Sequence, residues 1–124
     1  MAETRVQIGG GGYIVKTNGT GAAAMSVSFT AVRACKLGTV TCKFSAAPTT
    51  SENFTVSLDA NAGAAYDVTW FTYDPGAVGS ITFISVDETD IGEVWLVPGD
   101  IVTVAYTNTD TRTYGVEITV KEYG

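Results

Sequence analysis

The sequence predicts an all-β protein, an antiparallel β-sandwich that we expect to be a jelly roll of about eight to ten short strands. Three observations favour this fold. Apolar and polar residues alternate in many short runs, turn signals separate the runs by roughly ten residues, and no segment has the period of about 3.6 residues of a long helix. The composition agrees, because threonine occurs 19 times and glycine 14 times among 124 residues. A chain of this length suits one domain.

The first twelve residues differ from the rest of the chain. Residues 1–8, MAETRVQI, alternate apolar and polar side chains, and Gly9–Gly12 follow directly. The glycine run lacks the Lys-Ser/Thr ending of a phosphate-binding P-loop, so we interpret it as a hinge. We therefore predict an N-terminal arm and glycine-rich hinge over residues 1–12 and a single sandwich domain over residues 13–124. Such an arm can add as a strand to the sheet edge of a neighbouring molecule.

The stretch AVRACKLGTVTCKF, residues 31–44, predicts a β-hairpin. A two-residue turn at Gly38-Thr39 would place Cys35 opposite Cys42. The apolar residues of both strands then share one face, which favours this register. Folding in the cytoplasm favours two buried thiols over a cross-strand disulfide. Two thiols, in a chain without histidine, are too few ligands for a zinc site.

Eight further strands follow from alternation or from short apolar runs bounded by turns. Asn18-Gly19 and Asp74-Pro75-Gly76 are interpreted as turns. For the strand over residues 25–29, the alanine-rich run before Met25 leaves a short helix as the alternative. The eight strands are centred on residues 13–16, 25–29, 53–59, 66–73, 80–86, 93–97, 102–107 and 116–121.

The stretch VPGD, residues 97–100, lies where one of these strands begins. Pro98 and Gly99 suit the central positions of a type II turn, and Asp100 can accept a backbone N–H at the corner. We therefore interpret the stretch as a structural corner and not as part of an active site.

Charge and missing residue types restrict the function. The formal net charge is −6, so we expect no nucleic-acid partner. Histidine is absent, which removes the commonest general base, and we expect no enzymatic activity and no cofactor. No apolar run approaches the roughly 20 residues of a membrane span, and the first residues contain no signal-peptide core. We therefore expect synthesis in the cytoplasm and no membrane partner.

Three carboxylates occur within four residues at Asp87-Glu88-Thr89-Asp90, and Glu93 is close by. Carboxylates in a loop can bind Ca²⁺, but the spacing is not that of an EF-hand, and a solvated acidic loop is the simpler interpretation. No pair of carboxylates has a spacing that favours glycoside hydrolysis.

Aromatic residues concentrate in the strands over residues 66–73 and 93–97, which have apolar side chains on both faces. A sandwich buries only one face of each sheet, so this surplus predicts contacts between subunits. The alternative is that surface aromatics stack on sugar rings, as in a carbohydrate- or receptor-binding module. We predict assembly contacts at Val6, Ile8, Phe71, Tyr73 and Trp95.

The C-terminal run VPGDIVTVAYTNTDTRTYGVEITVKEYG, residues 97–124, resembles the ends of small β-sandwich proteins encoded among the virion structural genes of tailed bacteriophages. The resemblance covers the last quarter of the chain and supplies no catalytic residues. It implies an accessory virion protein, such as a head decoration protein or a component of a head or tail fibre.

These observations together predict a non-enzymatic structural protein of a virus particle, made in the host cytoplasm, that binds and stabilises the particle. The expected partner is the major capsid protein or another virion protein. We also expect a homo-oligomer, with a trimer as the favoured form.

Overall fold

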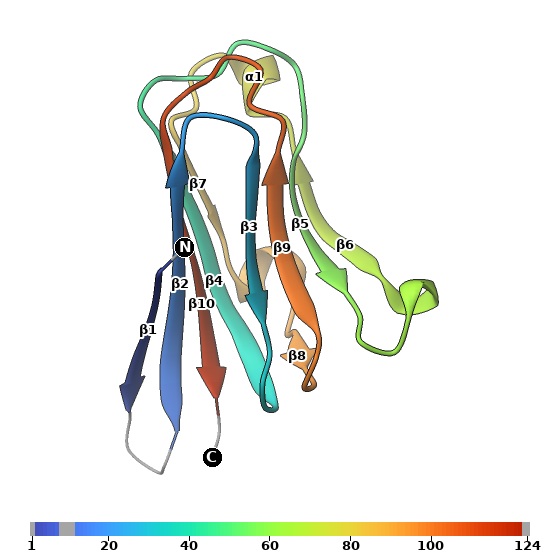
Figure 1. Cartoon of the computed structure of the whole chain (residues 1–124). Helices are drawn as coiled ribbons and strands as arrows, with labels where there is room; N and C mark the ends of the chain where they lie inside the picture. The colour runs from blue at the N-terminus through green and yellow to red at the C-terminus, as the bar shows by residue number, and fades with distance from the viewer. Residues whose placement is uncertain (1, 8–11, 123–124) are drawn as a thin grey trace.

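The computed structural model describes residues 2–7 and 12–122 and confirms the antiparallel β-sandwich. Two sheets pack face to face (Figure 1). Sheet A has the order β1-β2-β10-β4-β7, with β8 also pairing with β4, and sheet B has the order β3-β9-β5-β6, an interleaving that fits a jelly roll. The strands of sheet A are β1 (Ala2–Gln7), β2 (Tyr13–Gly21), β10 (Tyr114–Glu122), β4 (Cys35–Phe44), β7 (Phe83–Val86) and β8 (Trp95–Leu96), and those of sheet B are β3 (Met25–Thr30), β9 (Ile101–Tyr106), β5 (Phe54–Asp59) and β6 (Val68–Tyr73).

Short helical turns occupy connections between strands. A 3₁₀ turn, η2 (Ala64–Tyr66), joins β5 to β6, while α1 (Pro75–Val78) follows β6 and α2 (Glu88–Ile91) follows β7. Asp74, predicted to lie in a turn, is the N-cap of α1, and its carboxylate accepts a hydrogen bond from the N–H of Ala77. Within residues 2–7 and 12–122, no helix has the length and apolar character needed to cross a membrane.

The core lies between the two sheets. Inward and outward side chains alternate along the long strands, as in β10, where Val116, Ile118 and Val120 are buried. The sheets meet at large side chains such as Phe44 of β4 and Tyr106 of β9, whose ring centroids are 5.5 Å apart. The alternation in the sequence predicted these strands because one face of each sheet has to be apolar to cover the other.

The predicted hairpin at residues 31–44 is wrong, although its predicted inward face is right. β4 continues through Gly38-Thr39, where a β-bulge leaves Gly38 without a partner on β10 while Thr39 pairs with Thr119. The extra residue shifts the alternation by one position, so Leu37 and Val40 both point into the core, as they would on either side of a two-residue turn. A Cβ on Gly38 would lie 2.9 Å from the carbonyl oxygen of Thr119, so glycine here marks a close approach of two strands.

The predicted turn at Asn18-Gly19 is also wrong, because β2 runs through both residues and ends at Gly21. A Cβ on Gly19 would lie 2.5 Å from the side chain of Val27 in β3, so glycine lets the two sheets approach closely. The following segment forms the predicted strand β3 and not the alternative helix.

The N-terminal residues add a strand to the molecule's own sheet. β1 pairs antiparallel with β2, in a register that places Val6 opposite Ile14. Residues 2–7 of the predicted arm therefore lie along the edge of sheet A and do not stand apart from the sandwich, because their alternation matches the open edge of β2. Ile8 and glycines 9–11 of the predicted hinge lie outside the described residues.

Candidate assembly surfaces

Several acidic side chains hold loops in place at the end of the sandwich near α1. Asp110 accepts hydrogen bonds from the backbone N–H groups of Thr49 and Thr50, each at 2.8 Å, and Glu52 accepts one from the N–H of Thr109 at 2.7 Å. The bonds to Asp110 lower its pKa to about 2. These carboxylates are therefore part of the loop structure. Among the described residues, no group of three or more His, Cys, Asp or Glu side chains is arranged to hold a metal ion.

The acidic run at residues 87–90 forms a capped helix. The carboxylate of Asp87, the N-cap of α2, accepts the N–H of Thr89 at 2.9 Å, and the carboxylate of Asp90 accepts the N–H of Asp87 at 2.9 Å. Hydrogen bonds from Thr89 lower the pKa of Asp87. The predicted acidic loop is therefore a short helix, and two of its three carboxylates bind the backbone of that helix.

The corner at residues 97–100 has the geometry expected of a type II turn. Gly99 has φ 92°, and the N–H of Asp100 donates to the carbonyl of Val97 at 3.1 Å. The buried carboxylate of Asp100 accepts the N–H groups of Val97 at 3.0 Å and of Asn61 at 2.9 Å. Asp100 thus joins this turn to the β5–β6 connection, which supports a structural role for the corner.

The two thiols are free and buried, and they lie on the same strand. Cys35 and Cys42 are seven positions apart along β4, a separation of about 20 Å that excludes a disulfide between them. The predicted cross-strand pairing is therefore wrong, because there is no turn between them. Burial raises the pKa of Cys42 to about 12 and that of Cys35 to about 11, with smaller effects of Glu122 and Asp100 on Cys35.

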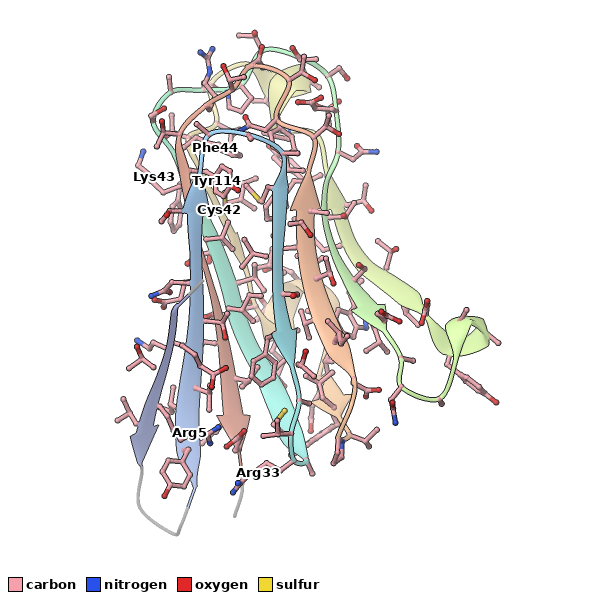
Figure 2. The ribbon with its side chains drawn as sticks, in the orientation of Figure 1. Arg5, Arg33, Cys42, Lys43, Phe44 and Tyr114 are labelled. Carbon is pink, nitrogen blue, oxygen red and sulfur yellow. The ribbon has the colours of Figure 1, made fainter. Side chains whose placement is uncertain are left out.

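A buried carboxylate fastens β1 to the sandwich. Glu122, at the end of β10, is fully buried and forms salt bridges with Arg5 of β1 and with Arg33 of the β3–β4 connection, the second at 3.7 Å. Figure 2 shows both arginines at the same end of the sandwich. The Arg5 guanidinium also lies 5.4 Å from the centre of the Tyr13 ring. These contacts fix the register in which β1 adds to β2.

The outer face of sheet A carries every lysine of the chain, and we call this surface the lysine face. The lysines come from β2, β4 and β10, and each alternates with buried neighbours. In Figure 2, Lys43 projects away from the side of β4 that Cys42 and Phe44 occupy. Glu117 is the one acidic residue at an outward position among the described residues of these three strands. The four lysines are Lys16, Lys36, Lys43 and Lys121.

One row of this face links two of the predicted assembly residues. The strand registers align Val6, Ile14, Lys121, Lys36 and Trp95 across the sheet. The two ends of the row are exposed, since Val6 is 48% and Trp95 is 56% accessible. The Lys36 ammonium lies 5.8 Å from the centre of the Trp95 ring. Lys36 also forms salt bridges with Glu88 at 3.2 Å and with Glu93 at 4.0 Å. The row therefore combines exposed apolar side chains with two lysines, one of which is paired with glutamates of its own chain.

A shallow hollow of about 280 Å³ lies toward the opposite end of the lysine face. The registers place Gly115 between Thr20 and Lys43, with Phe83 beyond Lys43, so the missing side chain of Gly115 leaves the hollow open. Phe83 lines it and is 54% exposed. Phe83 is not among the predicted assembly residues, because the run over residues 80–86 has apolar side chains on both faces and the buried face cannot be identified without the neighbouring strands.

Phe71 and Tyr73 lie elsewhere, on the edge strand β6 of sheet B. Both are partly buried against the core. The Phe71 ring packs edge-on against Phe54 and stacks on Tyr73, with ring centroids 6.3 Å apart in each pair. The structure thus places Val6 and Trp95 on one surface and Phe71 and Tyr73 on another.

Comparisons with known proteins show a shared fold. No protein-family model and no curated protein matches the sequence. The chain is similar to a chain of the acid-stable capsid of Helicobacter pylori bacteriophage KHP30, with a TM-score of 0.50 and 14% identity over 98% of this chain and 93% of that one. Weaker likenesses are to the Drosophila NLP core, a pentamer-forming and histone-binding protein (TM-score 0.47, 12% identity, 85% and 96% of the two chains), and to the Agl-KA catalytic domain (TM-score 0.37, 14% identity, 90% and 21%). The likeness to the capsid chain extends over nearly the whole length of both chains.

Proposed function

We propose that the protein is a non-enzymatic structural component of a virus particle, a capsid decoration or accessory head or tail protein that docks through the lysine face. The observation that carries this proposal is the concentration of all four lysines on one sheet face, beside the exposed Val6, Phe83 and Trp95, in a chain of net charge −6. The whole-length likeness to a capsid chain supports it.

The chemistry of the lysine face favours an acidic protein surface as its partner. Docking would remove the exposed apolar side chains from water, at about 25 cal/mol per Å² buried. Carboxylates of the partner would meet the lysines and orient the complex. Nucleic acid is a poorer match, because the 13 acidic residues of the chain outnumber its seven basic ones and repel phosphate at longer range.

The first test is detection of the protein in particles from its native source, by mass spectrometry, followed by co-sedimentation of the purified protein with particles that lack it. Lys43→Gln/Lys121→Gln should weaken binding severalfold, whereas Ser26→Glu/Thr30→Glu, on β3 of sheet B, should not. Both variants lower the net charge by two units, so a difference in binding between them reports the contribution of the lysine face and not that of the overall charge. Absence from the particles, or equal binding by the two variants, would overturn docking by this face. So would binding that nuclease treatment abolishes.

A second candidate function, recognition of a glycan, is favoured by the hollow beside Phe83. An exposed ring next to polar side chains such as Asn18, Thr41 and Glu117 suits stacking on a pyranose with hydrogen bonds to its hydroxyl groups. A glycan array probed with the labelled protein tests this function. Glycan recognition at this site requires binding that Phe83→Ala abolishes and Trp95→Ala preserves, since Trp95 does not line the hollow.

A further inference from the structure

The strand β6 has an open edge. It is the last strand of sheet B and pairs with β5 on one side. In Figure 1 the far end of the β5–β6 hairpin extends away from the rest of the sandwich. The free side of an edge strand presents a row of backbone N–H and C=O groups, so the partner that fits it best is another β-strand.

The composition of β6 provides neither charge nor proline at this edge. Its sequence, VTWFTY, consists entirely of β-branched and aromatic residues and has no charge. Natural sheet edges are commonly blocked by charged residues or proline. The edge strand β1 of sheet A carries Glu3 and Arg5, whereas β3, the other edge of sheet B, has only serine and threonine outward. Among these edges, β6 has the most apolar surface to gain from a partner strand.

The tip of the same hairpin is also exposed. Residues 61–69 are all accessible, and they include the apolar Tyr66 at 64% and Val68 at 47%. Trp70, Phe71 and Tyr73 are only partly buried by their own chain. A strand added alongside β6 would cover these apolar side chains.

We propose that two copies of this chain pair through β6, antiparallel about a two-fold axis between Trp70 and Phe71, so that their B sheets form one continuous sheet. A second copy is the partner that matches an uncharged strand, because a two-fold axis places identical surfaces against each other and like charges would repel. The contact produces a dimer, which differs from the trimer favoured by the sequence.

The β-bulge in β6 makes this register geometrically consistent. Phe71 pairs with Val56 and Thr69 with Ser57 on β5, so Trp70 is the extra residue. In a regular strand, side chains on the same face are an even number of positions apart. The extra residue changes this, so a side chain before the bulge and one after it share a face when they are an odd number of positions apart, as Val68 and Phe71 are. Val68, Phe71 and Tyr73 share the inner face of the sheet, because their partners on β5 do. In the proposed register every residue then meets one on the same face of the sheet, which a regular strand would not allow.

The residue pairs that this register creates are chemically matched. Val68 lies opposite Tyr73 of the second copy, Thr69 opposite Thr72, and Trp70 opposite Phe71. Aromatic pairs, aromatic–β-branched pairs and threonine pairs are favourable across antiparallel strands. The carboxylates that flank β6 are engaged within their own chain, since Asp67 accepts the N–H of Ala60 at 2.8 Å and Asp74 caps α1. The pairing is therefore limited to the six residues of β6.

The oligomeric state of the full chain tests the interface. Light scattering at tens of micromolar should give the mass of a dimer. Thr69→Lys/Thr72→Lys should reduce the dimer fraction severalfold or more, because residue 69 lies opposite residue 72 of the second copy and like charges directly opposite each other repel. Ser26→Lys/Thr30→Lys adds the same two charges at exposed positions on the opposite edge of sheet B and should leave the dimer intact. Equal melting temperatures would show that both variants fold.

Cysteine pairing tests the register. A chain with Thr69→Cys mixed with one carrying Thr72→Cys should form a disulfide-linked dimer under mild oxidation, whereas neither chain alone should do so, because residue 69 faces residue 72 and not itself. A wild-type monomer at tens of micromolar would overturn the proposal. So would a dimer that survives Thr69→Lys/Thr72→Lys, or cysteine pairing within each single cysteine variant. None of these results bears on particle docking, which uses the other sheet.

Discussion

Single residues at the loops carry much of the conformational specificity of this fold. Gly99 provides the positive φ of the corner, and the buried carboxylate of Asp100 accepts two backbone N–H groups beside it. Asp110 connects two loops that are 60 residues apart in sequence. Each of these positions predicts a measurable effect that is independent of any partner.

Gly99→Val should destabilise the protein by about 1–3 kcal/mol from backbone strain alone. The loss should be larger because a Cβ would lie 2.5 Å from the side chain of Asn61. Asp100→Asn should also cost about 1–3 kcal/mol, since an amide has one acceptor oxygen for two N–H donors. Urea unfolding measures both. If Gly99→Val unfolds at the same urea concentration as the wild type, the turn assignment is wrong. If Asp100→Asn does so, the two hydrogen bonds to Asp100 do not stabilise the fold.

The lowered pKa of Asp110 predicts acid sensitivity. A carboxyl whose pKa falls from 3.8 to about 2 on folding stabilises the folded state above pH 4, and this contribution is lost as the pH falls from about 4 to about 2. Asp110→Asn should therefore be less stable than the wild type at pH 6, and the difference should shrink toward pH 2. Thermal melts across this range provide the measurement, and a pH-independent difference would contradict the assignment.

The buried thiols should be inert in the folded protein. Their raised pKa values, about 11 and about 12, leave almost no thiolate at pH 8. Iodoacetamide should add no label to the native protein and two labels after unfolding without reductant. Intact-mass measurement distinguishes these states. Labelling of the native chain would show that β4 opens, and an unlabelled unfolded chain would show a disulfide.

At the scale of strands, alternation was a reliable guide to which side chains point inward, but not to where strands end. The bulge at Gly38 and the close approach at Gly19 both use glycine within a strand, whereas local sequence favoured turns. Both errors have one cause. Glycine is required at these positions because Thr119 and Val27 lie too close for a Cβ atom, and both residues are distant in sequence from the glycine that they contact.

The attachment of β1 is the prediction that belongs to this scale. Arg5→Met should cost about 1–3 kcal/mol, less than for a fully buried pair because the arginine is partly exposed, and should release β1 from β2. Hydrogen exchange should show faster exchange along β1 and the facing residues of β2, with sheet B unchanged. Lys16→Met is the matched control, since its bond to Glu117, at 3.9 Å, is exposed. If Arg5→Met and Lys16→Met change hydrogen exchange along β1 equally, the salt bridge to Glu122 does not hold β1 on the sheet.

At the scale of the whole molecule, the distribution of charge predicts how binding depends on salt. Docking of the lysine face on an acidic surface should weaken severalfold between low salt and about 0.5 M NaCl, where screening extends over only a few ångströms. The β6 dimer should be insensitive to the same change, because its strand is uncharged. Binding and light scattering measured on one salt series separate the two surfaces. A salt-independent particle complex would contradict electrostatic docking.

The sequence by itself determined the fold class and most of the inward-facing residues. Strand alternation is a local property, so it can be recognised from neighbours along the chain, as in the predicted strand over residues 102–107, where Val102, Val104 and Tyr106 are buried. Only the tertiary structure decided which strands are adjacent. The lysines of three strands form one surface because β10 lies between β2 and β4, a pairing between the two ends of the chain that no local pattern encodes. The same non-local pairing leaves β6 at an edge, and that position makes its aromatic residues available for contact.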